Sequence, residues 1–277
     1  IKKRMRSKFI SLQSPYTLSL EEEDINPKNS DLICRTIYSA ISPGTEIAAY
    51  KGAKPLHKNA KKFPRLLGYC NLSKIEEVLD PASAFTVGDR ILTFQSHRDL
   101  FGVKTEEVIL KISDEVSDKD AVCSYLFHLG ISALEGLLIQ PEEKLIIFGL
   151  GCLGMTSSIM ALNHGCRVSI VSDHKNSIDN LNGVKVDKFY SRDELSELLE
   201  DNNLEFDASI VTTSNWQDIL ISSKSLNNYG RIGILGFPGR DESLPNFNPF
   251  DSNYFYARQL TYKALGMWTL KKKRLTL

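Results

Sequence analysis

The chain has 277 residues, of which 42% are hydrophobic and 25% are charged, values typical of a globular protein with one large or two ordinary domains. Lysine plus arginine equals aspartate plus glutamate at 34 each, and this balance argues against a nucleic-acid-binding or membrane-surface protein. The five cysteines are odd in number and form no CxxC pair. They therefore indicate reduced thiols in a cytoplasmic protein, not a disulfide framework or a zinc knuckle.

Residues 1–140 are predicted to form a β-rich domain. DLICRTIYSAI (31–41) has the β-branched residues of a strand, and SPGTE (42–46) follows it as a Pro-Gly turn. TVGDRIL (86–92) is typical of a turn and a strand, and TEEVILKI (105–112) of another strand. Short strands separated by glycine and proline turns favour a small barrel-like β domain.

The segment 118–139 has the apolar spacing of helices and is predicted as two helices broken near Gly130. Its apolar run is interrupted by His128, Gly130 and Glu135. A helix buried in a protein core explains this pattern better than a membrane span does.

Residues 141–267 alternate strands and helices. A capping box, Ser191 with Glu194, begins the helix at 191–200, and Asn228-Tyr-Gly230 is predicted to end the helix before the fifth strand. Six strands joined by helical crossovers favour a doubly wound parallel sheet of the Rossmann type. The predicted strands are 145–148, 167–172, 184–190, 207–212, 231–236 and 260–265.

A glycine-rich turn follows the first of these strands. Gly149-Leu-Gly151-Cys-Leu-Gly154 fits G-x-G-x-x-G and opens a helix. Gly149 suits the tight turn, Gly151 lets a pyrophosphate approach the backbone, and Gly154 permits close packing of helix and strand. The helix N-terminus offers unpaired N–H groups to the phosphates. The motif therefore predicts a dinucleotide site, and Cys152 and Leu153 within it are included among the cofactor-binding residues.

Asp173 lies 19 residues after Gly154, at the end of the second strand. A carboxylate there accepts hydrogen bonds from the adenosine ribose and repels a 2′-phosphate, which favours NAD. His174 and Lys175 follow directly and would suit a phosphate, so NADP stays open as the alternative.

Several motifs together carry a resemblance to a known family. They are ISPGTEIAAYKG (41–52), FPRLLGYC (63–70), FTVGDRIL (85–92), HLGISALEGL (128–137), FGLGCLG (148–154), VTTS (211–214) and YGRIGILGFPG (229–239). From about Ser7 to Trp268, the chain resembles the medium-chain dehydrogenase/reductase superfamily, in particular the branch with bacteriochlorophyllide and sugar or polyol dehydrogenases. The resemblance implies a GroES-like β domain followed by a Rossmann domain, with the active site in the cleft and the chain forming a homodimer through the edge strand of the Rossmann sheet.

The resemblance also implies residue roles in cofactor binding. Thr212 and Thr213 follow the fourth Rossmann strand, and Gly236 and Phe237 end the fifth. Relatives line the cofactor cleft with these strand ends, and Ser132 is at a position that faces the nicotinamide or the substrate. The physical rule agrees, because open α/β sheets bind ligands at the carboxyl ends of their strands.

Departures from the family pattern concern zinc. Zinc-dependent relatives carry a cysteine before the G-T-D turn and a Gly-His-Glu motif, whereas this chain has SPGTE without cysteine and Gly68-Tyr69-Cys70. The four-cysteine structural zinc loop is also absent. Because zinc needs three or four Cys, His or carboxylate ligands, no metal site is expected. A substituted site of Glu46, Cys70 and His128 is the alternative.

Tyr69 and His128 occupy positions where the relatives hold metal ligands, so each is a candidate proton donor or acid/base group. Thr45 is a hydroxyl that by resemblance faces the substrate, and Glu46 is expected to orient a partner or balance charge. The remaining histidines, His57, His97 and His164, show no such spacing and are predicted to be surface or loop residues.

These observations predict an NAD(P)-dependent, zinc-independent oxidoreductase that moves a hydride between nicotinamide and an alcohol or carbonyl carbon of a small sugar- or polyol-like substrate. The alternatives are a zinc enzyme with substituted ligands and a non-catalytic dinucleotide-binding sensor or scaffold. Residues 268–277 are expected to be the remnant of a segment that in relatives completes the first domain.

Overall fold

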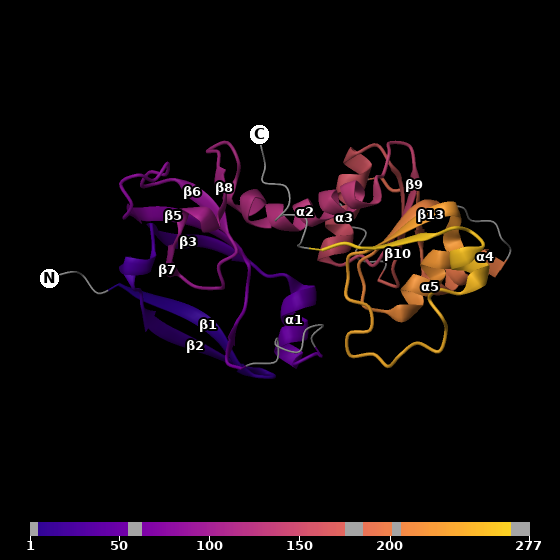
Figure 1. The fold of residues 1–277 in the computed structure, drawn as a ribbon, viewed down its shortest axis with the longest axis horizontal. Coiled ribbons are helices and arrows are strands. Elements are labelled where there is room, and N and C mark those ends of the chain that lie inside the picture. Colours follow the sequence, from indigo (N-terminus) through magenta and orange to yellow (C-terminus); the bar gives the residue numbers. More distant parts are fainter. Residues whose placement is uncertain (1–4, 55–62, 175–184, 201–205, 267–277) are drawn as a thin grey trace. The chain divides into compact units, whose positions relative to one another are not determined.

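The computed structural model describes residues 5–54, 63–174, 185–200 and 206–266, so predictions for His57 and for residues 268–277 lie outside the described residues. The chain divides into two compact units, Ile1–Tyr125 and Leu126–Leu277 (Figure 1). The division falls inside helix α2, Asp118–Leu137, whereas a domain boundary was predicted after residue 140.

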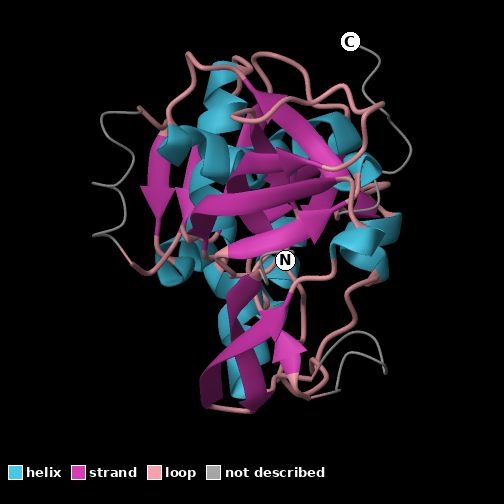
Figure 2. Ribbon diagram, turned by 90° about the vertical axis from the view of Figure 1, so that its left-hand side faces the viewer, coloured by secondary structure: helices cyan, strands magenta, loops and turns pink. Residues whose placement is uncertain are grey.

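Strands predominate in the first unit (Figure 2). A five-stranded antiparallel sheet has the order β7-β3-β5-β6-β8, and a smaller sheet has the order β2-β1-β4. The strands of the five-stranded sheet are β3 (Leu32–Ala40), β5 (Cys70–Val78), β6 (Arg90–Thr93), β7 (Leu100–Val103) and β8 (Val108–Ile112). Those of the smaller sheet are β1 (Arg6–Ser14), β2 (Thr17–Asp24) and β4 (Arg65–Leu66), and two short 3-10 turns, Pro27–Asn29 and Thr105–Glu107, lie in the connections.

The predicted Pro-Gly turn at 42–46 is wrong, because helix α1 (Pro43–Lys51) begins there. Pro43 occupies the first helical position, where a missing N–H costs nothing and the fixed φ favours a helix. Ser42 is the N-cap, and Gly52 ends the helix with a left-handed φ of 71°. Proline suits both the second position of a turn and the start of a helix, so the local sequence is compatible with either structure.

The second unit contains one parallel sheet of six strands, in the order β11-β10-β9-β12-β13-β14. From β9 the chain adds β10 and β11 on one side of the sheet and then β12, β13 and β14 on the other. This is the doubly wound Rossmann arrangement predicted from the alternating pattern. The strands are β9 (Lys144–Phe148), β10 (Arg167–Val171), β11 (Lys188–Tyr190), β12 (Phe206–Val211), β13 (Leu226–Ile234) and β14 (Thr261–Ala264). The helices are the second part of α2, then α3 (Cys152–Asn163), α4 (Arg192–Glu200), α5 (Trp216–Ser225) and a π-helical turn at Ser252–Tyr256.

Strand β9 shows why its sequence is an uninterrupted apolar run. Leu145 and Ile147 point into the core formed with α2 and α3, whereas Ile146 and Phe148 point into the core formed with α4 and α5. All four side chains are fully buried. A strand covered by helices on both faces needs apolar residues at every position, so the central strands carry no alternation.

Two predicted helix boundaries are wrong. Gly130 does not break a helix, because α2 is continuous; a Cβ at residue 130 would lie 3.0 Å from the Ser157 Cα of α3. The glycine therefore lets two helices pack closely, which outweighs its weak helix propensity. Asn228-Tyr-Gly230 does not end a helix either: α5 ends at Ser225, and the three residues lie within β13, where its register with β12 shifts.

None of the helices among the described residues is both long and apolar enough to cross a membrane.

Candidate functional site

The glycine turn lies at the carboxyl end of β9, as predicted. Gly149 has a left-handed φ of 94°, and its N–H donates to the Val171 carbonyl at 2.8 Å. A Cβ on Gly154 would lie 2.0 Å from the Gly149 carbonyl oxygen, so this glycine allows the turn to close on helix α3. The fold itself therefore needs a glycine at two of the three positions: Gly149 for its left-handed φ, and Gly154 for its close contact with the turn.

Gly151 differs from the other two glycines, because a Cβ there would meet nothing within 4 Å. It is the exposed N-cap of α3, and no side chain caps the helix at this residue. The space over it is therefore open, next to the N-terminus of a helix, which is the geometry that binds a phosphate. Cys152 and Leu153 form the first turn of this helix, and Leu153 packs against the core.

Asp173 follows the end of β10 with its side chain 54% exposed. The Arg192 backbone N–H donates to one carboxylate oxygen at 3.1 Å, and the Arg192 guanidinium donates to the other at 2.5 Å. These contacts hold the pKa of Asp173 below its ordinary value, and the backbone hydrogen bond from Arg192 has the largest effect. Asp173 is therefore a carboxylate at neutral pH, fixed beside the glycine turn's strand.

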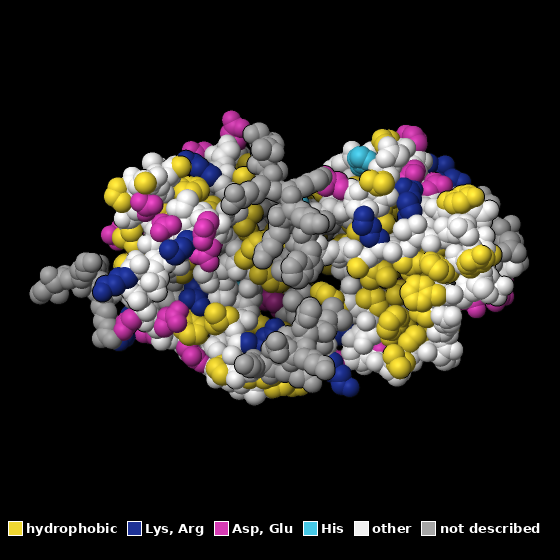
Figure 3. Space-filling view, viewed as in Figure 1, with side chains coloured by type: hydrophobic (Ala, Val, Ile, Leu, Met, Phe, Trp, Pro, Cys, Tyr) yellow, Lys and Arg dark blue, Asp and Glu magenta, His cyan; other side chains and the backbone are white. Residues whose placement is uncertain are grey.

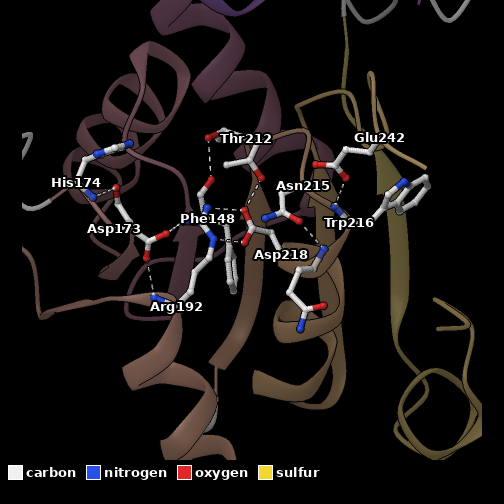
Figure 4. Close-up of polar contacts among 12 residues, drawn as sticks. Phe148, Asp173, His174, Arg192, Thr212, Asn215, Trp216, Asp218 and Glu242 are labelled. Carbon is white, nitrogen blue, oxygen red and sulfur yellow. Dashed lines mark hydrogen bonds and ion pairs between the residues drawn. The ribbon is translucent and has the colours of Figure 1, made fainter. Parts of the chain in front are cut away.

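The residues after β12 and β13 lie at the same edge of the sheet. Thr212 donates through its hydroxyl to the Phe148 carbonyl at 2.8 Å, and Thr213 donates to the carboxylate of Asp218 (Figure 4). A Cβ on Gly236 would lie 2.1 Å from the Thr213 carbonyl oxygen, so Gly236 brings the two strand ends together. Phe237 follows with 37% exposure, and the Arg240 guanidinium lies 4.3 Å from the centre of its ring.

In the first unit, the structure brings Tyr69 next to the start of α1. Its hydroxyl donates to the Ser42 hydroxyl, and its ring packs edge-on against Tyr125 with centroids 5.9 Å apart. Burial raises the pKa of Tyr69, while hydrogen bonds with Ser42 and Thr45 offset part of the shift. Tyr69 therefore keeps its proton at neutral pH, as a proton donor must.

Glu46 has a structural role at the start of the same helix. The Ser42 N–H donates to one carboxylate oxygen at 2.8 Å, and the other oxygen lies 2.7 Å from His97 Nε2. The Glu46 side chain is 9% exposed and that of His97 is 11% exposed. The carboxylate thus accepts the N–H of the N-cap residue of α1 and holds Ser42, whose hydroxyl accepts from Tyr69.

His97 was predicted to be a surface or loop residue, and the surface part of that prediction is wrong. It lies in a loop but is held on both ring nitrogens, by Glu46 on Nε2 and by the Ser39 hydroxyl on Nδ1. Gly68, with a φ of 90°, leaves room for the ring: a Cβ there would lie 2.8 Å from it. No spacing in the sequence signalled this contact, because residues 39, 46, 68 and 97 come from four separate segments.

His128 lies in the second part of α2, with Nε2 3.2 Å from the Ser132 hydroxyl one turn further along the helix. Burial lowers the pKa of His128, against a smaller opposing effect of Glu135. The imidazole is therefore mainly neutral at pH 7. Because His128 and Ser132 belong to the second unit, the structure does not relate them to Tyr69.

Of the residues proposed for a substituted zinc site, Glu46 and Cys70 belong to the first unit and His128 to the second. Among the described residues, no three His, Cys, Asp or Glu side chains lie together as a metal-binding group. Both oxygens of Glu46 are engaged by Ser42 and His97, and Cys70 is buried with 3% exposure at the start of β5.

Two further polar residues, Arg192 and Asp218, lie at the sheet edge and had not been predicted from the sequence. Arg192 begins α4 and Asp218 lies in the first turn of α5. Each looks like an ordinary charged helix residue in the sequence. Only the pairing of the two helix starts shows that Asp218 is a fully buried ion-pair partner.

The chain matches no family model. Among curated proteins, it is 20% identical to an uncharacterized zinc-type alcohol dehydrogenase-like protein of Haemophilus influenzae, over 87% of this chain and 79% of that protein.

Solved structures match the fold over nearly the whole chain. L-idonate 5-dehydrogenase of Escherichia coli has a TM-score of 0.82 at 12% identity, covering 95% of this chain and 83% of that one. A short chain alcohol dehydrogenase of E. coli in complex with NADH has a TM-score of 0.77 at 16% identity, covering 94% and 83%. S. aureus TarJ in complex with NADPH has a TM-score of 0.75 at 14% identity, covering 94% and 80%. At these identities the likeness shows the fold, and the predicted fold class is confirmed.

Proposed function

We propose that this chain, which has the medium-chain dehydrogenase/reductase fold that its motifs predicted, is an NAD(P)-dependent oxidoreductase. The observation that carries the proposal is the glycine turn between β9 and α3. Gly151 leaves open space beside the N-terminus of α3, and Gly149 and Gly154 shape the turn that presents it. A bound nicotinamide dinucleotide supplies or accepts a hydride, and the protein's residues hold it and move the accompanying proton.

NAD is the favoured cofactor because of Asp173. Its carboxylate stays ionised, is about half exposed and lies just beyond β10, next to β9 and the glycine turn. An ionised carboxylate at this place accepts hydrogen bonds from the two ribose hydroxyls and repels a 2′-phosphate.

Tyr69 is proposed as the proton donor to the developing alkoxide when a carbonyl is reduced, and as the acceptor in the reverse direction. Its raised pKa keeps the hydroxyl protonated, and Ser42 and Thr45 hold that hydroxyl in place. His128, neutral and hydrogen-bonded to Ser132, is proposed as a second acid/base group. Glu46 acts through Ser42 and α1 and is a positioning residue.

The reaction is proposed to run without zinc, because Tyr69 stands where the resemblance places a histidine ligand and no cysteine precedes the SPGTE turn, so two of the expected ligands are missing. The substrate is proposed to be a small polar alcohol or carbonyl compound of sugar or polyol type. This class rests on the resemblance and on L-idonate 5-dehydrogenase among the structures of the same fold.

Cofactor binding and turnover together test the function. The purified chain is titrated with NADH and NADPH by fluorescence and then assayed against a panel of sugar alcohols, polyols and their carbonyl forms. We expect binding, turnover of a polyol-type substrate, and loss of turnover in Tyr69→Phe and His128→Ala while NADH binding is kept. Full activity of both variants would remove these residues from the mechanism. Tight NADH binding without turnover on any substrate would favour a sensor or scaffold.

Metal analysis tests the zinc alternative. Protein purified without chelator is expected to carry no stoichiometric zinc and to keep its activity in a chelator. Zinc bound one to one, and lost in Cys70→Ser or His128→Ala, would replace the proposal by a zinc enzyme with substituted ligands.

The chain is further proposed to be a cytoplasmic homodimer joined through β14. This strand pairs only with β13 among the described strands, so one edge is available to a second copy. Figure 3 shows hydrophobic side chains gathered on the second unit, and Leu244, Phe250 and Tyr256 are large exposed residues of the segment before β14. A monomer by light scattering at micromolar concentration would contradict the dimer.

A further inference from the structure

The guanidinium of Arg192 lies between two carboxylates at the carboxyl edge of the parallel sheet (Figure 4). Its Nε and Nη2 donate to the two oxygens of Asp218 at 2.7 Å and 2.9 Å. Its third nitrogen, Nη1, donates to Asp173 at 2.5 Å. Arg192 thus uses one side of its fork for a bidentate pair and the remaining nitrogen for the residue that is proposed to bind the ribose.

The two carboxylates differ in burial, and the difference fixes the arginine. Asp218 is 0% exposed and also accepts from the Thr213 hydroxyl, whereas Asp173 is 54% exposed. A bidentate pair with a buried carboxylate is rigid, because removing either partner would leave an uncompensated buried charge. Asp218 therefore anchors the guanidinium, and Asp173 occupies the nitrogen nearer to solvent.

The charges of these three side chains sum to one negative charge, which opposes a phosphate. Without Asp173 the sum would be zero, and Nη1 of Arg192 would be unoccupied at the place where a ribose 2′-substituent is expected. Arginine binds phosphate well because its nitrogens match the phosphate oxygens. The site therefore contains a phosphate-binding group that its own carboxylate covers.

We infer that Arg192 is a specificity-determining residue: Asp218 holds its guanidinium at the ribose edge, and Asp173 selects NAD over NADP by occupying Nη1 as well as by its own charge. The inference rests on the proposed dinucleotide function. Beyond that function, Asp173 covers a 2′-phosphate site on Arg192, and the buried ion pair with Asp218 holds Arg192 in place.

The test measures the dissociation constants of NADH and NADPH for the whole chain by fluorescence, so that turnover is not needed. The wild type is expected to bind NADH more tightly than NADPH. In Asp173→Ser, Arg192 keeps its buried partner while Nη1 is released. We expect NADPH to bind about tenfold to a hundredfold more tightly than to the wild type, the equivalent of one charge-assisted hydrogen bond.

A second variant separates the arginine's geometry from charge. The double variant Asp173→Ser with Arg192→Lys has the same net charge as Asp173→Ser alone and keeps a cation beside Asp218. One ammonium group, however, cannot pair with both Asp218 and a phosphate. We expect most of the NADPH gain to disappear. If the double variant keeps the whole gain, the role of Arg192 is overturned, and if Asp173→Ser shows no gain, the covered phosphate site is overturned.

Asp187→Ser is the matched control. Asp187 pairs with Arg167 at 2.9 Å, at the opposite end of β10, and its substitution removes the same charge from the same unit. We expect NADPH affinity to stay within about twofold of the wild type, because Asp187 lies at the far end of the strand from Asp173 and salt screens exposed charges that are well separated. An equal gain in this control would attribute the effect to net charge and overturn the inference. A wild type that binds neither cofactor would overturn the proposed function itself, whereas the other outcomes leave it in place.

Discussion

The edge of the parallel sheet in the second unit and the Tyr69 cluster in the first unit are built in different ways. At the sheet edge, the strand ends are next to one another because the topology is regular, and the glycine turn is one continuous stretch, 149–154. Around Tyr69, side chains from four segments meet through hydrogen bonds: Ser39, the start of α1, Gly68-Tyr69 and His97. The first arrangement follows from residues close together in the chain, whereas the second needs contacts between residues that are distant in the sequence.

The largest expected effect is on turnover in the Tyr69 cluster. Tyr69→Phe removes the proposed proton donor but keeps the ring that packs against Tyr125, so we expect kcat to fall about 10²- to 10⁴-fold with an unchanged midpoint of thermal unfolding. Tyr38→Phe, at a tyrosine of β3 that is 45% exposed, is the control and should keep full activity. Equal rates in both variants would show that the Tyr69 hydroxyl is not needed.

The next largest effect is on stability at the sheet edge. Arg192→Leu leaves the carboxylate of Asp218 buried without its ion-pair partner, and we expect the free energy of unfolding to drop by about 3–5 kcal/mol. Arg192→Leu combined with Asp218→Leu removes both charges and should recover most of that loss. Denaturant unfolding measures all three proteins. A single variant as stable as the wild type would mean that Asp218 is not held as described.

The glycine turn provides a matched pair of substitutions. Gly154→Ala places a Cβ 2.0 Å from the Gly149 carbonyl oxygen, and such overpacking is expected to cost about 1–3 kcal/mol of stability. Gly151→Ala meets no atom within 4 Å, so stability should change by less than about 0.5 kcal/mol, while NADH affinity falls because the methyl group fills the space proposed for the pyrophosphate. Unchanged NADH affinity in Gly151→Ala would move the cofactor away from this turn.

The smallest effect concerns pH and Asp173. Because the folded-state pKa of Asp173 is lowered, its ionised form stabilises the fold above the unfolded-state pKa, and this contribution is lost as the pH falls through the lowered folded value. The side chain is about half exposed, so Asp173→Asn should cost less than about 1 kcal/mol at pH 7 and nothing below the folded pKa. A difference that grows on acidification would contradict this sign, and added salt should reduce it.

Much of the second unit could be predicted from its sequence. Each predicted strand lies at or within a few residues of an observed one, because apolar runs bounded by glycine turns are local signals. The errors at Gly130 and Asn228–Gly230 share one cause. Whether a glycine breaks a helix depends on what packs against it, and Ser157 of α3, the neighbour of Gly130, is distant in the sequence.

In the first unit, the sequence supplied the residue types but not their partners. Tyr69, Thr45 and Glu46 were candidates by resemblance, and the structure adds that Ser42 contacts the phenol and that Glu46 is engaged by the helix start and by His97. Nothing in the spacing of His97 indicated a partner, because its contacts span 51 and 58 residues of chain. The catalytic roles of Tyr69 and His128 stay predictions that the variants above test.

By itself, the sequence determined the parallel sheet, the glycine turn and the acidic residue after the second strand, because each depends on residues close together in the chain. The tertiary structure alone decided that Arg192 links an exposed carboxylate to a buried one, and that Ser42, Glu46 and His97 form one hydrogen-bonded cluster next to Tyr69. Long-range contacts of charged side chains leave no periodic trace in a sequence, since any charged residue at a helix start looks alike until its partner is in place.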